Sequence, residues 1–383
     1  MVTFLSYFSV CLVVKNTGIN SQKPRIFARF MNQYIISGIQ QVGIGVANVH
    51  EAFKWYNQKL GMDIQIFEEA AEANLMLPYT GGQPQTRHAI LAINMKGGGG
   101  FEIWQYTSRT PQAANFKPQL GDIGLFCAKI KSDDIKASYD FLKSQSVKIL
   151  GDISTNPLGK KHFYIEDAYA NLFEIIEDNV WFGKGLQHTG GPIGMVIGVS
   201  NLDQSIAFYK DILGYDKVLY KDTSGTHTLN DLPGGEKKLK QAILTHSEAR
   251  KGPFAKLFGN SYIELIEAID YQPRSIFENR FWGDLGFIHL CFDVKNMTAL
   301  KTKCESLGHP FTVDGGAGFE MGEAAGHFTY IEDPDGTLIE FVETKKIPIM
   351  KKWGWYLDLR NRAPEKALPT WMLKALKFNR KTF

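Results

Sequence analysis

The sequence repeats itself, and the register of the repeat limits the possible folds more than any other feature. The segment 39–48 reappears at 192–201, and one offset of 153 residues persists from there past Gly235. A second offset, of 162 residues, relates 121–124 to 283–286. Chance does not preserve a register over such lengths, so the chain consists of duplicated modules. The modules fall near 39–110, 120–178, 192–270 and 283–344.

The four modules share one predicted order of elements. Each opens with a period-two apolar run such as Val42, Ile44 and Val46, which is typical of a strand with one buried face. A helix follows, with apolar residues at helical spacing and a closing glycine, Gly61 in the first module and Gly214 in the third. Three further strands complete the module. The sequence therefore predicts an α+β fold of four βαβββ modules.

Composition and charge narrow the class of protein. The chain of 383 residues is 44% hydrophobic and 22% charged, as in globular proteins. Its net charge is +3, but Lys and Arg concentrate in residues 1–30 and in the tail 345–383, so the body between them is acidic. An acidic body argues against nucleic acid as the main partner. We expect the tail to pack through its tryptophans, and the extension 1–38 to be poorly ordered.

Cysteine spacing and hydropathy indicate the cellular compartment of the protein. The four cysteines lie far apart and include no CxxC pair, which favours a reducing, cytoplasmic location. The apolar run 1–14 is too short to span a bilayer, so no membrane span is expected.

Two motifs link the modules to a known family. The first is Phe53-Lys-Trp-Tyr56 followed by Leu60-Gly61, and the second is the closing Glu332-Asp-Pro-Asp-Gly-Thr-Leu-Ile-Glu340. This pattern resembles the vicinal oxygen chelate superfamily, which includes glyoxalase I, the bleomycin resistance proteins and the extradiol dioxygenases. The resemblance implies two curved mixed-sheet half-barrels, each made by two modules. We expect consecutive modules to pair, giving domains at 39–180 and 190–344.

The resemblance also implies a divalent metal ion held by the first and last strands of each pair. Strand parity agrees, because Gln41 must face away from the helix-facing Val42 and Ile44. Four glutamates at equivalent positions invite one common explanation, and a cation is the simplest. The alternative is that they pair with nearby Lys, Arg or Tyr side chains and stabilise the sheet. The expected positions are Gln41, Glu102, Cys127 and Glu174 in the first pair and Gly194, Glu264, His289 and Glu340 in the second, with Cys127 a packing thiol and Gly194 unable to ligate.

The leading hypothesis is a divalent-metal-dependent, glyoxalase-like lyase or isomerase. It would act on a small oxygenated substrate through a metal-stabilised enediolate, with Glu340 or Glu174 as general base. Zinc, nickel, manganese and iron all remain open as the ion. Trp104 and Tyr106 are expected to form aromatic walls for the substrate, and His88 to bind an anionic group on it.

Two other functions stay open. An Fe(II) extradiol-type dioxygenase is permitted by His289 and Glu340, but Gly194 stands where that class would supply a second histidine, unless His246 or His227 substitutes. A non-catalytic, bleomycin-resistance-like binding protein would tolerate an incomplete metal site. Four modules in one chain make dimerisation unnecessary for building a site, and the oligomeric state is left open.

Overall fold

The computed structural model describes residues 33–383, except 226–228, 317, 322–323, 351–353 and 361. The expectation for the N-terminal extension therefore lies almost wholly outside the described residues. The part from Tyr34 to Phe383 forms one compact unit. None of the helices in the described part is long and apolar enough to cross a membrane.

The first two modules have the predicted order of elements. In the first they are β1 (Ile35–Gly45), α2 (Val49–Leu60), β2 (Ile64–Glu72), the 3-10 turn η1 (Leu77–Tyr79), β3 (Thr86–Ile93) and β4 (Gly100–Tyr106). In the second they are β5 (Gly124–Ser132), α3 (Ile135–Ser144), β6 (Lys148–Thr155), β7 (Lys161–Glu166) and β8 (Leu172–Glu177).

The last two modules repeat this order with small additions. In the third they are β9 (Pro192–Val199), α4 (Leu202–Asp211), β10 (Lys217–Asp222), β11 (Leu239–Thr245), the short α5 (Ala255–Phe258) and β12 (Tyr262–Ala268). In the fourth they are β13 (Gly286–Lys295), α6 (Met297–Ser306), β14 (Val313–Asp314), β15 (Phe319–Met321), β16 (Ala324–Glu332) and β17 (Leu338–Met350).

The helix boundaries follow from capping. The Asn48 side chain accepts hydrogen bonds from the first backbone N–H groups of α2, and Asn201 caps α4 in the same way. Gly61 ends α2 in the left-handed conformation, with φ of 67°, as predicted. The helix α4 ends earlier, and Gly214 lies three residues beyond it with φ of 71°.

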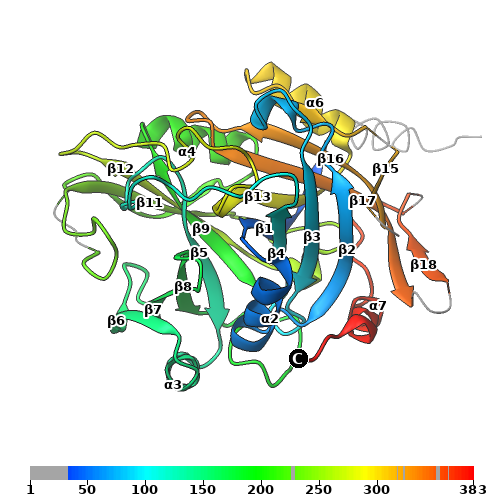
Figure 1. Cartoon of the computed structure of the whole chain (residues 1–383), viewed down its shortest axis with the longest axis horizontal. Helices are drawn as coiled ribbons and strands as arrows, with labels where there is room; N and C mark the ends of the chain where they lie inside the picture. Colours follow the sequence, from blue (N-terminus) through cyan, green and yellow to red (C-terminus); the bar gives the residue numbers. More distant parts are fainter. Residues whose placement is uncertain (1–32, 226–228, 317, 322–323, 351–353, 361) are drawn as a thin grey trace, which may run out of the picture. The chain divides into compact units, whose positions relative to one another are not determined.

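The modules pair differently from the expectation. One sheet has the strand order β14-β16-β17-β13-β1-β4-β3-β2 and joins the first module to the fourth (Figure 1). The other has the order β10-β11-β12-β9-β5-β8-β7-β6 and joins the second module to the third. In both sheets the opening strands of two modules meet antiparallel, β1 with β13 and β5 with β9. We call the curved mixed sheet of the first and fourth modules the outer half-barrel and that of the second and third modules the inner half-barrel, after the order of the modules in the sequence.

The modules that were expected to share a sheet, the first with the second and the third with the fourth, still contact each other, but through their helix-facing surfaces. Phe101 and Phe173 pack with ring centroids 5.7 Å apart in the core that lies on this side of the sheets. The Tyr56 hydroxyl donates a hydrogen bond of 2.6 Å to Asp167, and the repeat-related Tyr209 donates to Asp333 at 3.0 Å. The first module therefore packs face to face on the second, and the third on the fourth, whereas the second and third modules share a sheet.

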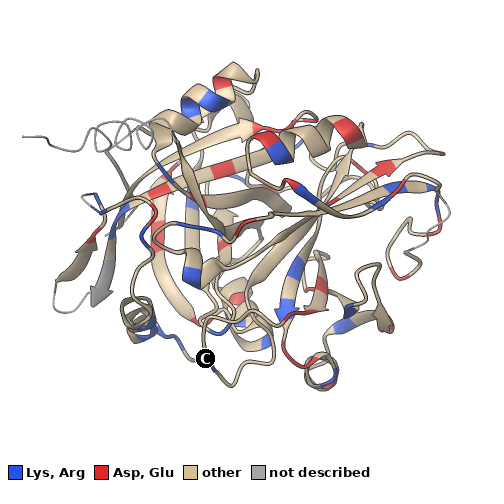
Figure 2. Ribbon diagram, turned by 180° about the vertical axis from the view of Figure 1, so that it is seen from behind, with Lys and Arg blue, Asp and Glu red and all other residues tan. Residues whose placement is uncertain are grey.

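The tail packs on the outer half-barrel. It forms β18 (Trp355–Asp358), which pairs with β17, then α7 (Thr370–Lys374) and the 3-10 turn η3 (Ala375–Asn379). Packing was expected, but through tryptophans. The buried side chains instead include the leucines Leu359, Leu368, Leu373 and Leu376, whereas Trp371 is 60% exposed. Acidic and basic residues are scattered over the ribbon (Figure 2), and one ion pair joins Arg380 to Asp63 of the first module at 3.3 Å.

Candidate functional site

Four polar side chains meet on the concave face of the outer half-barrel. They are Gln41 and Glu102 from the first module and His289 and Glu340 from the fourth, and all four are buried. Gln41 Nε2 donates hydrogen bonds to Glu102 Oε2 at 2.9 Å and to Glu340 Oε2 at 3.4 Å. His289 Nε2 lies 3.3 Å from Glu102 Oε2 and 3.1 Å from Glu340 Oε2. We call these residues the outer cluster.

The strand register explains why these residues meet. Gly43 on β1 lies opposite His289 on β13 and beside Glu102 on β4. A Cβ atom at Gly43 would lie 2.3 Å from His289 Cε1, so the imidazole occupies space that any other residue would fill. Glycine at this position therefore allows His289 to lie across β1 toward the carboxylates.

The outer cluster favours a positive charge between its carboxylates. Burial lowers the pKa of His289, but Glu340 and Glu102 outweigh burial and raise this pKa to about 10. Burial raises the pKa of Glu340, but the charge of His289 and hydrogen bonds hold it below its ordinary value. The Tyr330 hydroxyl lies 3.3 Å from His289 Nδ1, where it orients the ring.

The donor atoms of the outer cluster fit a divalent metal ion. The ligand atoms of Glu102, His289 and Glu340 lie within 4.8 Å of one another. Gln41 Oε1 is buried and has no hydrogen-bond partner among the described residues, although a buried acceptor normally has one. Two carboxylates, an amide oxygen and one imidazole form a donor set for a hard or borderline ion.

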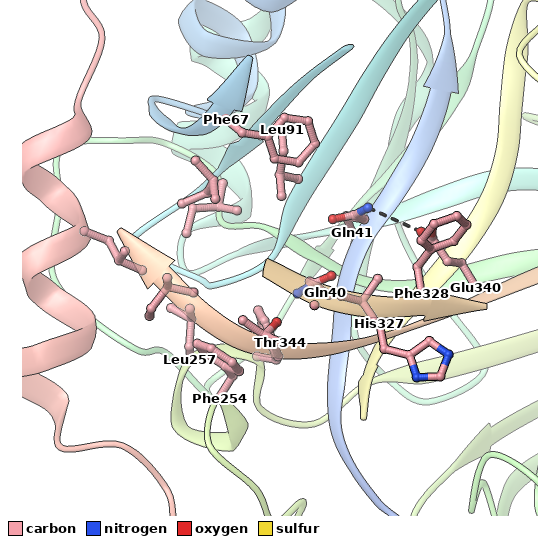
Figure 3. A pocket seen from close by; sticks show the side chains of 17 residues that line it. Gln40, Gln41, Phe67, Leu91, Phe254, Leu257, His327, Phe328, Glu340 and Thr344 are labelled. Atoms are coloured by element: carbon pink, nitrogen blue, oxygen red, sulfur yellow. Dashed lines mark hydrogen bonds between the residues drawn. The ribbon is translucent and has the colours of Figure 1, made fainter. Parts of the chain in front are cut away.

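An apolar pocket opens beside the outer cluster. It encloses about 920 Å³, including space open to solvent, and Gln41 and Glu340 belong to its wall. Figure 3 shows these two side chains together with the polar Gln40, His327 and Thr344, and the remaining labelled side chains of the wall are apolar. Two segments that are distant in sequence complete the pocket wall, and the sequence analysis did not predict this. One is α5 of the third module with its preceding residue, which contributes Leu257 and Phe254, and the other is the tail, which contributes Leu376.

The inner half-barrel holds a different group at the equivalent place, which we call the inner cluster. Glu174 on β8 and Glu264 on β12 correspond to Glu340 and Glu102. The Lys129 ammonium forms ion pairs with both carboxylates, at 2.6 Å from Glu264 Oε2. His162 Nδ1 lies 2.8 Å from Glu174 Oε1. Gln241 Nε2 donates to Glu264 Oε1 at 2.5 Å.

The residues that face each other across β5 and β9 differ in pairs from those that face each other across β13 and β1. Lys129 lies opposite Gly194, and Cys127 lies opposite Val196. A Cβ atom at Gly194 would lie 3.1 Å from Lys129 Cδ and 2.4 Å from the Tyr262 carbonyl oxygen, so glycine leaves room for the lysine chain. Val196 occupies the position that is equivalent to Gly43, which leaves room for His289 in the outer half-barrel.

In the inner cluster, the positive charge of Lys129 compensates the negative charges of the two carboxylates. Burial lowers the pKa of Lys129, but the two carboxylates raise it above its ordinary range. Burial raises the pKa of Glu174, but Lys129 and His162 outweigh burial and lower this pKa to about 2. Burial raises the pKa of the Cys127 thiol well above its ordinary value, which agrees with a packing role.

The structure rearranges the expected ligand sets. Gln41 and Glu102 meet His289 and Glu340 instead of Cys127 and Glu174, because β1 pairs with β13 and not with β5. Glu174 and Glu264 meet each other in the inner cluster. Glu340 and Glu174, both expected as bases, therefore lie in different half-barrels.

The residues expected to bind substrate lie elsewhere. Trp104 and Tyr106 are buried beside Trp282, with ring centroids of Trp104 and Trp282 4.6 Å apart, and not in the pocket wall described above. His88 lies 3.1 Å from Glu68 on the opposite face of β3 from the pocket residue Leu91. Strand parity alone accounts for this separation of His88 from Leu91.

Of the two histidines considered as substitutes, His246 has its contacts away from the outer cluster. His246 Nδ1 lies 2.7 Å from the Glu248 carbonyl oxygen, and burial lowers the pKa of His246 to about 4. His227 lies outside the described residues.

Comparison with known proteins supports one family. The family described as "Glyoxalase/Bleomycin resistance protein/Dioxygenase superfamily" matches residues 38–175 and 185–341. None of the curated proteins matches the chain in sequence.

Solved structures show the same fold. A variant of glyoxalase I from Zea mays superposes with a TM-score of 0.53 at 15% identity, covering 83% of this chain and 96% of that one. A putative dioxygenase from Bacillus subtilis superposes with a TM-score of 0.51 at 14% identity, covering 81% and 86%. At such identities the likeness concerns the fold alone. With the family match over both repeats, the chain belongs to the glyoxalase/bleomycin resistance protein/dioxygenase superfamily.

Proposed function

We propose that the chain is a divalent-metal-dependent, glyoxalase-like lyase or isomerase whose site is the outer cluster. The observation that carries this proposal is the meeting of Gln41, Glu102, His289 and Glu340 at the wall of an apolar pocket. A metal ion bound there would polarise an oxygen of the substrate and make a neighbouring C–H bond more acidic.

The protein side chains would then position the substrate and move its proton. Glu340 belongs to both the cluster and the pocket wall, so its carboxylate is the proposed proton acceptor. Glu174, the other candidate base, is held by Lys129 and His162 in the inner half-barrel, and the proposal gives it no part in proton transfer. The apolar wall favours a substrate that carries an apolar group beside its oxygen atoms.

The donor set favours this reaction class over ferrous dioxygenase chemistry. Oxygen-activating ferrous sites use two histidines and one carboxylate. The outer cluster offers one imidazole, two carboxylates and one amide. The inner cluster resembles what a non-catalytic binding protein would tolerate, but the outer cluster retains a complete donor set.

Metal content and proton exchange test the proposal together. Purified protein loaded separately with zinc, nickel, manganese or iron should retain one ion in the outer cluster. It should exchange the α-proton of a small hydroxy- or oxo-carbonyl compound with D2O, followed by proton NMR. Glu340→Gln should weaken metal binding at least 10-fold and abolish exchange, whereas the matched variant Glu264→Gln should retain both.

The outcomes separate the candidate functions. Equal metal affinity in wild type and Glu340→Gln, or exchange that Glu340→Gln does not reduce, would overturn the proposal. Oxygen uptake by the iron-loaded protein with catechols would replace it with a dioxygenase.

A further inference from the structure

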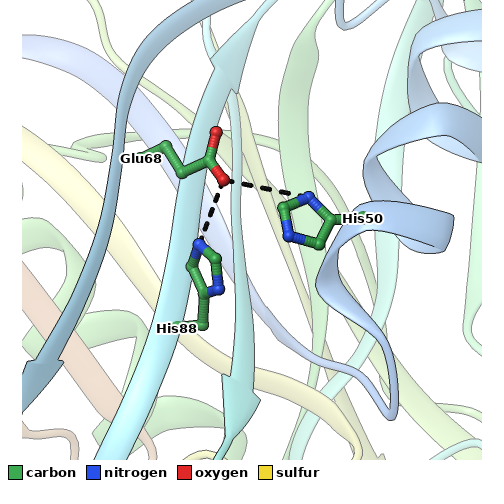
Figure 4. A group of neighbouring side chains, drawn as sticks. All are labelled: His50, Glu68 and His88. Carbon is green, nitrogen blue, oxygen red and sulfur yellow. Dashed lines mark hydrogen bonds and ion pairs between the residues drawn. The ribbon is translucent and has the colours of Figure 1, made fainter.

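A second group of potential metal ligands lies on the surface of the first module, away from both clusters. It consists of His50 at the start of α2, Glu68 on β2 and His88 on β3 (Figure 4). His88 Nε2 lies 3.1 Å and His50 Nδ1 3.8 Å from the same oxygen, Glu68 Oε1. The three ligand atoms lie within 4.8 Å of one another.

The local structure holds these ligands in place from three separate elements. Gln65 Nε2 donates to Glu68 Oε2 at 2.7 Å, so the other oxygen of Glu68 is the one that faces the histidines. The imidazole rings of His50 and His88 are perpendicular, with centroids 4.9 Å apart. Each ring therefore directs one nitrogen toward Glu68, as Figure 4 shows.

We propose that His50, Glu68 and His88 form an exposed binding site for a borderline transition-metal ion such as Zn²⁺ or Cu²⁺. Two imidazoles and one carboxylate are a common ligand set for such ions, and solvent supplies the remaining position. Ligand atoms of a tetrahedral zinc site lie roughly 3–4 Å apart, given zinc–nitrogen and zinc–oxygen distances of about 2 Å. The side chains of His50 and Glu68 are 62% and 37% exposed, so small rotations bring the ligands together.

The proposed ion would link α2 to the β2–β3 hairpin. Phe67, which precedes Glu68, pairs in register with Leu91, and both line the pocket from the other face of the hairpin. An ion that fixes Glu68 and His88 would therefore also restrain this part of the pocket wall. The proposal does not depend on metal binding by the outer cluster.

Nitrogen ligation distinguishes the two sites. The outer cluster contains one imidazole, whereas the surface site contains two. Chelator-stripped full-length protein carrying Glu102→Gln and Glu340→Gln is titrated with Cu²⁺ and examined by electron paramagnetic resonance. We expect superhyperfine splitting from two nitrogens, which should be lost when His88→Ala is added.

The second measurement is the number of Zn²⁺ ions bound per chain. By isothermal titration with Zn²⁺, otherwise unmutated protein should bind one more ion than His88→Ala, or bind it at least 10-fold more tightly. His188→Ala is the matched control, because His188 is an exposed histidine stacked on Phe141. Retained two-nitrogen ligation in the His88→Ala background, or identical Zn²⁺ binding in wild type, His88→Ala and His188→Ala, would overturn the proposal.

Discussion

The outer and inner half-barrels have the same architecture but satisfy their buried carboxylates differently. In the outer one, Glu102 and Glu340 face the His289 imidazole and the Gln41 amide. In the inner one, the corresponding carboxylates enclose the ammonium of Lys129. Two facing carboxylates in a buried place need a positive charge between them. A lysine on a flexible chain supplies it permanently, whereas the outer cluster retains donors for an exchangeable ion.

The difference rests on exchanges between paired strands. Across β1 and β13, glycine faces histidine, whereas across β9 and β5 valine faces cysteine. Two residues along each strand, Gln41 faces Cys291 in the outer half-barrel, and Gly194 faces Lys129 in the inner one. In both half-barrels, the side chain that reaches the carboxylates lies opposite a glycine that leaves room for it. The two clusters therefore differ by pairs of facing residues and not by single residues.

Removing the internal cation should have the largest effect. Lys129→Met leaves two facing carboxylates without their buried partner, and the free energy of unfolding should fall by roughly 3–5 kcal/mol. Urea denaturation monitored by circular dichroism measures this loss. Lys131→Met is the control on the same face of β5, because burial lowers the pKa of Lys131 to about 8 and, within the described residues, its Nζ donates a hydrogen bond only to the Val180 carbonyl oxygen, at 3.3 Å. Equal losses in the two variants would contradict the role given to Lys129.

Acid should weaken the inner half-barrel through Glu174. The folded pKa of about 2 lies below the ordinary 4.5, so Glu174 contributes its full stabilisation above about pH 4.5 and loses it as the pH falls toward 2. The contribution is on the order of 2–3 kcal/mol. Unfolding free energies measured between pH 6 and 2 should fall less steeply in Glu174→Gln than in wild type. Parallel curves would show that Glu174 does not carry this dependence.

A single methyl group should disturb the outer cluster. In Gly43→Ala the new Cβ would lie 2.3 Å from His289 Cε1, so the imidazole must move. We expect metal affinity to fall roughly 10–100-fold, as when the support of a metal ligand is lost. Val196→Ala, at the equivalent position of the inner half-barrel, should leave metal affinity unchanged. Competition with a chromophoric chelator measures both, and an unchanged affinity in Gly43→Ala would refute the steric argument.

The smallest effect is expected from the ion pair that joins the tail to the outer half-barrel. Arg380 is 41% exposed, so its pairing with Asp63 should contribute less than about 1 kcal/mol. Thermal unfolding of Arg380→Ala should therefore differ little from wild type. A loss above 2 kcal/mol would show that electrostatics, and not burial of Leu373 and Leu376, holds the tail.

Most of the fold could be predicted from the sequence. The repeat register and strand periodicity predicted four βαβββ modules, and the family motifs predicted curved mixed sheets, both of which are confirmed. The pairing of the modules could not be read from these signals. All opening strands are similarly apolar, so periodicity does not indicate whether β1 joins β5 or β13.

The candidate site was predicted in parts. Glu102, Glu174, Glu264 and Glu340 do face the concave surfaces, because alternation along a strand fixes the face. Their partners were predicted incorrectly, since they depend on the pairing of modules. One local signal was available, because a histidine such as His289 needs a small residue opposite it. Pairing of the glutamates with a nearby lysine was the alternative to a metal ion, but no sequence pattern distinguished Lys129, which lies within an apolar strand, as that partner.

The nested pairing has a consequence for synthesis on the ribosome. The inner half-barrel is continuous in sequence, from Gly124 to Ala268, whereas the outer one joins 35–106 to 286–350. Closing so long a loop is entropically unfavourable and slow compared with local pairing. The first module therefore emerges long before its sheet partner exists, and its apolar strand edge at β1 must wait while the inner half-barrel assembles. The outer cluster is complete only once the last strands of the chain have been made, so a prematurely terminated product could be well folded in its middle and still lack this cluster.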